Sequence, residues 1–166
     1  MKEQKLKALE RKIKKATREE TWFYPEHNRV KGWTGTQPIM FVGSNPSCNK
    51  FPTRYTDFFY EQLEKNGFRN AHLTDLIKIR ARNNDADAVI DKTFNEQIKF
   101  FEEEIKIIEP KIIVIMGKRA ERTLKKFNYE NKRIEFIYHY SSIRFPKNIP
   151  GFISGMKKIK KLYSQK

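Results

Sequence analysis

The chain has 166 residues, which is enough for one hydrophobic core and awkward for two. Its aromatic share of 13% argues against disorder, and 35 lysines and arginines against 20 acidic residues give a net charge of +15. Such a surface attracts polyanions, so nucleic acid and an anionic membrane surface both fit as partners. No apolar run approaches the roughly 18 residues of a membrane span, so we expect no membrane-spanning segment.

The chain contains one cysteine, Cys48, which rules out an internal disulfide and a four-thiolate metal or iron–sulfur site. The three histidines lack the spacing of metal ligands, and there is no Walker or glycine-rich dinucleotide fingerprint. We therefore expect no metal and no cofactor. We also expect a monomer in a reducing, intracellular (cytoplasmic) environment.

The N-terminal segment, residues 2–20, has the pattern of a basic helix. Leu6, Leu9, Ile13 and Ala16 recur at three- and four-residue spacing and form one narrow apolar seam. We expect this helix to pack on the edge of the domain, with contact to DNA as the alternative.

After an irregular aromatic loop at 22–35, apolar runs alternate with helical patterns. The predicted strands cover 39–42, 69–74, 111–116 and 133–138, and the predicted helices cover 53–66, 91–109, 118–127 and 152–163. Continuous apolar strands separated by helices indicate a parallel sheet that is covered on both faces. We expect a single α/β domain over 1–166, a three-layer α/β/α sandwich with a four-stranded parallel central sheet, in which 1–35 packs on the 36–166 core.

Polar residues follow each predicted strand directly, at 43–47, 74–76, 117–119 and 139–144. In an open parallel sheet, ligands bind beyond the carboxyl ends of the strands. The polar and special residues of the chain therefore converge on one edge of the sheet.

These segments resemble the motifs of uracil-DNA glycosylases. Residues 39–47, IMFVGSNPS, resemble an apolar strand running into Gly-x-Asn-Pro-Gly, and 139–143, HYSSI, are similar to His-Pro-Ser-Pro followed by a wedge residue. LTDLIK at 73–78 is similar to the Thr-Asn-x-Val segment of the pyrimidine pocket, and IEPKIIVIMG at 108–117 matches the lead-in to the third strand. The resemblance covers about 38–163 and is closest to the Gly-x-Asn-Pro branches, the mismatch-specific and single-strand-selective types. The chain would be a divergent member.

The resemblance implies a monofunctional DNA glycosylase of base-excision repair, which hydrolyses the N-glycosidic bond of a deaminated or mismatched base, uracil or a related one. Such an enzyme flips the nucleotide into a pocket. Asn45 would position the attacking water, and His139 would hydrogen-bond the departing base. An Asn-Pro turn and a buried structural histidine are the alternatives. Because an amide is not a strong general base, the enzyme would depend on electrostatic stabilisation and react more slowly than relatives with Asp here.

The base would contact Gly43, Ser44, Phe51, Tyr55 and Asp75. Phe51 would stack on the flipped base, with Tyr55 as the substitute if Phe51 belongs to the core. Asp75 departs from the family's Asn, because an ionised carboxylate only accepts hydrogen bonds. It would oppose uracil O4 and suit an exocyclic amine or a ring N–H, unless it is protonated in the pocket. A helix N-cap is the alternative role for Asp75.

A third set of residues would contact the DNA around the flipped nucleotide. Ile143 would wedge into the space that the base vacates, and Arg144 would bind a flanking phosphate. Lys118 and Arg119 begin a predicted helix, where charge and dipole favour a phosphate, although an ordinary solvated helix start has the same pattern. The full set is Pro46, Ser47, Lys118, Arg119, Ser141, Ser142, Ile143 and Arg144.

Two other functions stay open. Asp75, together with Tyr140 and Ser142 in place of the second motif's usual prolines, fits a non-catalytic DNA-binding or damage-sensing protein on the same fold. A nucleotide-binding α/β protein that shares only a Gly-x-Asn-Pro turn is the third hypothesis. The partner expected for the first two is DNA, single- or double-stranded, containing a damaged base, and no membrane.

Overall fold

The structure is a computed structural model that describes residues 1–131 and 133–165. Its centre is a sheet of four parallel strands in the order β2-β1-β3-β4. The strands are β1 (Gln37–Gly43), β2 (Ala71–Asp75), β3 (Ile112–Met116) and β4 (Ile134–Ile137). The predicted parallel sheet is therefore confirmed.

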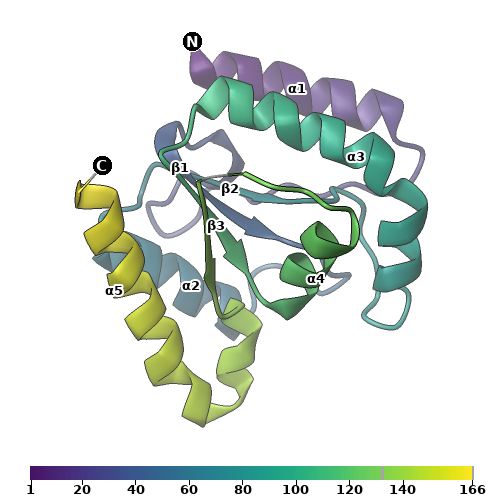
Figure 1. Ribbon diagram of the computed structural model, residues 1–166. Helices are drawn as coiled ribbons and strands as arrows, with labels where there is room; N and C mark the ends of the chain where they lie inside the picture. Colours follow the sequence, from purple (N-terminus) through teal and green to yellow (C-terminus); the bar gives the residue numbers. More distant parts are fainter. Residues whose placement is uncertain (132, 166) are drawn as a thin grey trace.

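Five α-helices and three short 3₁₀ helices complete the described chain. They are α1 (Lys2–Ala16), η1 (Gly32–Thr34), α2 (Arg54–Lys65), α3 (Ala86–Ile108), α4 (Lys118–Lys126), η2 (Tyr140–Arg144), η3 (Pro146–Asn148) and α5 (Ile149–Gln165). Figure 1 shows α1, α3 and α4 on one side of the sheet and α2 and α5 on the other. No described helix is long and apolar enough to cross a membrane.

The strands contribute alternate residues to two hydrophobic clusters, one on each face of the sheet. Met40 and Ile113 pack with the side chains of α1, α3 and α4, whereas Phe41 and Val114 pack with those of α2 and α5. This alternation follows from the two-residue period of a strand. It confirms the three-layer α/β/α architecture.

The register of the sheet aligns the carboxyl ends of the strands. Gly43 at the end of β1 pairs with Asp75 at the end of β2, and Met116 at the end of β3 pairs with Ile137 at the end of β4. The polar segments that follow these strands therefore begin at the same edge of the sheet.

Three predicted helix boundaries are wrong. α1 ends at Ala16 rather than at residue 20, because Thr17 is extended. α3 begins at Ala86 rather than at residue 91, since buried Ala86 continues the apolar face at four-residue spacing. α5 begins at Ile149 rather than at residue 152, because Pro150 is tolerated in a first turn that needs no N–H from it.

Two glycines let α5 approach the end of β4 closely. A Cβ added at Gly151 would lie 2.4 Å from the ring of Tyr138, and one at Gly155 would lie 3.2 Å from Cγ2 of Ile137. The helix therefore packs directly on the segment that leads into His139.

Candidate active site

A pocket of about 350 Å³ opens at the carboxyl edge of the sheet. Its wall includes ends and loops of β1, β3 and β4, the first turns of α2 and α4, and the aromatic loop before η1. The charged side chains among its described lining residues are all basic: Lys50, Arg80, Lys118, Arg119 and Arg144. The pocket is therefore suited to an anionic ligand.

Most of the residues predicted for the site meet at this pocket. Those that line it are Ser44, Asn45, Pro46, Ser47, Phe51, Tyr55, Lys118, Arg119, His139, Ser141 and Arg144. Gly43, Asp75, Ser142 and Ile143 are not among its lining residues. Gly43 and Asp75 lie directly behind the wall, at the paired ends of β1 and β2.

The side chain of Asn45 is held by its own loop. The hydroxyl of Ser44 donates to Oδ1 of Asn45 at 3.0 Å, and Nδ2 of Asn45 donates to the carbonyl oxygen of Pro46 at 3.2 Å. These two bonds fix the plane of the amide in the pocket wall.

Arg80 holds the same loop from outside. Its Nε donates to the carbonyl oxygen of Ser47 at 3.0 Å, and its Nη2 donates to that of Asn49 at 2.9 Å. Its Nη1 also pairs with Glu20 at 3.1 Å. The guanidinium therefore joins the loop after β1 to Glu20 and to the segment after β2 that carries Arg80.

His139 is oriented by the residues that follow it. Its Nδ1 accepts a hydrogen bond from the backbone N–H of Ser141 at 3.1 Å, and the Ser141 hydroxyl lies 2.7 Å from the same nitrogen. Because Nδ1 is the acceptor, Nε2 carries the proton of the neutral ring. Burial, together with the positive charge of Arg119, lowers the pKa of His139 to about 4. At neutral pH the ring is thus an uncharged N–H donor.

Asp75 ends β2 and is almost completely buried, with 4% of its surface exposed. Burial raises its pKa, the positive charge of Lys78 opposes this rise, and the negative charge of Glu104 adds to it; together they move the pKa from the usual 3.8 to about 7. The helix-cap alternative is wrong, because the next helix after Asp75, α3, begins only at Ala86.

A family model for the uracil DNA glycosylase superfamily matches residues 32–158, more than half of the chain. The chain belongs to the uracil-DNA glycosylase superfamily. No curated protein matches it. The matched range begins at η1 and includes the loop after β1, the end of β2, the start of α4 and the His139 segment.

Two tyrosines that sequence reasoning did not assign to the site line the pocket of this superfamily member. The hydroxyls of Tyr24 and Tyr140 lie 3.2 Å apart, and the Tyr140 ring stacks on Phe59 at 4.8 Å. Burial raises the pKa of both phenols, so both keep their protons. Tyr24 comes from an irregular loop without a motif, and the run of aromatic residues at 22–24 was its only signal.

Phe51 fits both of its expected roles, stacking on the flipped base and packing in the core. Its half-buried ring lines the pocket and packs edge-on against His27 at 5.2 Å and Tyr60 at 5.8 Å. Tyr55 also lines the pocket, and the guanidinium of Arg54 lies 4.9 Å from its ring. Phe51 therefore offers the pocket a ring that its neighbours hold in place.

The guanidinium of Arg119 already has partners within the protein, unlike a side chain that is free to bind a phosphate. It begins α4 together with Lys118, as predicted. Its Nε pairs with Asp87 at 3.3 Å, and its Nη2 donates to the carbonyl oxygen of Asn83 at 3.3 Å. These contacts join α4 to the start of α3.

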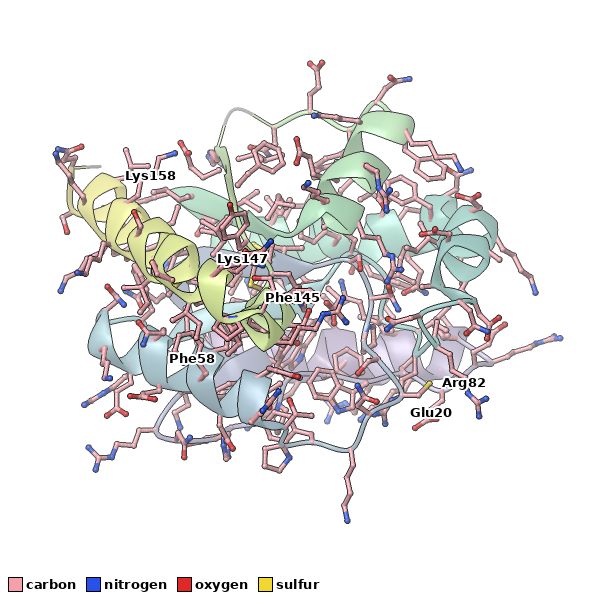
Figure 2. All side chains as sticks on the ribbon, turned by 90° about the horizontal axis from the view of Figure 1, so that it is seen from below. Glu20, Phe58, Arg82, Phe145, Lys147 and Lys158 are labelled. Carbon is pink, nitrogen blue, oxygen red and sulfur yellow. The ribbon has the colours of Figure 1, made fainter. Side chains whose placement is uncertain are left out.

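The exposed apolar side chain directly after the last site segment is that of Phe145. Ile143 is half-buried and packs on the cluster of α2 and α5, whereas 49% of the Phe145 surface is exposed. The guanidinium of Arg144 lies 4.8 Å from the Phe145 ring. Figure 2 shows Phe145 and Lys147 beside the first turn of α5.

Proposed function

We propose that the protein is a monofunctional DNA glycosylase, which hydrolyses the N-glycosidic bond of a deaminated or mismatched base in base-excision repair. The observation that carries this proposal is that a neutral His139 donor and a fixed Asn45 amide line the same pocket. The basic lining of that pocket favours the phosphates of DNA.

The reaction needs a water, a donor and a surface for the ring of the base. Asn45 holds the water, whose oxygen bonds to the anomeric carbon as the bond to the base nitrogen breaks. The electron pair of that bond leaves on the base, and Nε2–H of His139 stabilises the charge at a carbonyl oxygen of the base. The water's proton passes to solvent, and the base stacks on Phe51.

Lys118 and Arg144 bind phosphates that flank the flipped nucleotide. Ile143 is the wedge that the family resemblance implies, and exposed Phe145 is a second candidate for that position. Ser47 and Ser141 contact the backbone through hydroxyl and N–H groups.

The base is selected at the end of β2, by Asp75 directly behind the pocket wall. Asp75 as a carboxylate accepts from an amine or a ring N–H, and as a carboxylic acid it also donates to a carbonyl such as uracil O4. Strict selection of uracil therefore requires the protonated form. An Asp in this position favours a broader set of bases.

One panel of oligonucleotides tests the proposal. Single- and double-stranded DNA carrying uracil, hypoxanthine, xanthine or a thymine mismatch is incubated with the protein, and abasic sites are then cleaved with alkali. We expect alkali-labile sites on at least one deaminated base. Binding to every oligonucleotide without cleavage of any would support the non-catalytic DNA-binding function, which Tyr140 in the second motif favours.

A further inference from the structure

Four ionisable side chains form a buried cluster behind the pocket: His72, Asp75, Lys78 and Glu104. At most 4% of the surface of each is exposed. The Lys78 ammonium pairs with Glu104 and donates to the backbone carbonyl oxygen of Asp75 at 2.6 Å. His72 Nε2 lies 3.0 Å from the same Glu104 carboxylate, and His72 Nδ1 donates to the carbonyl oxygen of Trp33 at 2.7 Å.

A contribution to the stability of the fold does not explain why these charged side chains are buried together. A buried ion pair seldom stabilises a fold more than apolar side chains of similar volume would, because both charges lose their hydration. Glu104 also lies on the mostly apolar buried face of α3, between Phe101 and Ile108. The reaction proposed above uses no contact of Lys78 or Glu104.

Asp75 is the member of this cluster whose carboxyl approaches the pocket. A Cβ added at Gly43 would lie 2.2 Å from Oδ1 of Asp75 and 3.6 Å from the hydroxyl of Tyr24, so both groups approach the same point. Tyr140 meets Tyr24 there. Lys78 and Glu104 are the charged groups that act on Asp75 from the cluster, and the two phenols face it from the pocket.

We propose that Lys78 and Glu104 set the charge of Asp75 and thereby select the base edge that the pocket accepts. Lys78 favours the carboxylate, and Glu104 favours the carboxylic acid. The base-reading half of this proposal rests on the proposed function, whereas the charge-setting half does not.

The consequence is a base preference that changes with pH. Burial raises the pKa of Asp75 to about 7. Below that pH the carboxylic acid donates to uracil O4 and accepts from the ring N–H. Above it the carboxylate still accepts from the ring N–H but opposes O4, so the pocket accepts uracil less well.

The charge-setting half is tested without any substrate. The side-chain carboxyl of Asp75 is titrated by ¹³C NMR in the full-length protein, with Asp75→Asn to assign the signal. Lys78→Met should move the midpoint up by about one pH unit or more, and Glu104→Gln should move it down. Opposite shifts are not expected from a merely structural role.

The double variant Lys78→Met/Glu104→Gln keeps the test decisive if Lys78→Met does not fold. It leaves no unpaired charge in place of the ion pair, and its midpoint should lie between those of the two single variants. Midpoints that stay at the wild-type value, or that move in the same direction in both single variants, would overturn the proposal.

The base-reading half is tested by single-turnover rates on uracil between pH 6 and pH 8, measured for the wild type and for Asp75→Asn. The rate of the wild type relative to that of Asp75→Asn should fall by about tenfold or more across this range, because only the wild type titrates at this position. A flat relative rate with a normal carboxyl titration overturns the base-reading half. If no base is released at all, the proposed function fails, and the titration still decides the charge-setting half.

Discussion

At the scale of single residues, burial changes the titration of two groups of the site, Asp75 and His139. Burial disfavours the charged form of both, so it raises the pKa of the carboxyl and lowers that of the imidazole. The fold thereby holds His139 neutral at physiological pH and places the titration of Asp75 near it.

The stability of the protein should report the buried carboxyl of Asp75. Its pKa is about 7 in the folded protein and near 3.8 in the unfolded chain, so between these values the folded state holds a proton that the unfolded state releases. The contribution of Asp75 to the free energy of unfolding is therefore full below pH 4 and is lost as pH rises through 7.

Asp75→Asn should for this reason be more stable than the wild type above pH 7, by up to about 4 kcal/mol. The advantage should shrink toward pH 4. Urea denaturation at pH 4, 6 and 8 measures it. A stability difference that is the same at all three pH values would show that the carboxyl does not titrate in this range.

At the scale of elements, the loop after β1 depends on a residue outside it. Arg80→Gln removes the two bonds from the guanidinium to the carbonyls of Ser47 and Asn49. The single-turnover rate should fall by about tenfold to a hundredfold, because a small displacement of Asn45 misplaces the water. Binding of DNA should change far less than the rate.

The matched control for this variant is Arg82→Gln, which removes an exposed arginine two positions further on (Figure 2). It should keep the wild-type rate. Equal losses in both variants would assign the effect to charge and not to the position of the loop.

The sequence predicts the sheet, the parallel direction of its strands and the convergence of the four motif segments, because apolar strands that alternate with helices dictate them. It misses contacts between distant segments. Tyr24 reaches the pocket from a loop with no periodicity, and Arg80 holds a loop that comes more than thirty residues earlier. The role of Glu104 could have been suspected from the sequence, because an acidic residue on the buried face of a predicted helix requires a buried partner.

At the scale of the whole molecule, the net charge of +15 and the basic pocket lining predict salt-sensitive binding to DNA. The logarithm of the association constant should fall linearly with the logarithm of salt concentration, by about 0.9 for each phosphate that is neutralised in a duplex. Lys118→Ala and Arg144→Ala should each reduce the slope by about 1.

Lys106→Ala is the control for these variants, because Lys106 is exposed in the last turn of α3 and is not among the pocket lining residues. It should leave the slope almost unchanged. A flat salt dependence in the wild type would contradict binding through phosphates.

The central claim is that Asn45 and His139 act together in base release. The measurement that tests it most directly is the single-turnover rate of base release by Asn45→Ala and His139→Ala, on the deaminated base that the wild type cleaves best. Asn95→Ala, an exposed change on α3, serves as the control, and thermal melting confirms that each variant is folded. We predict losses of about a hundredfold or more in the two site variants and none in the control. Near-wild-type rates in both site variants would contradict the claim.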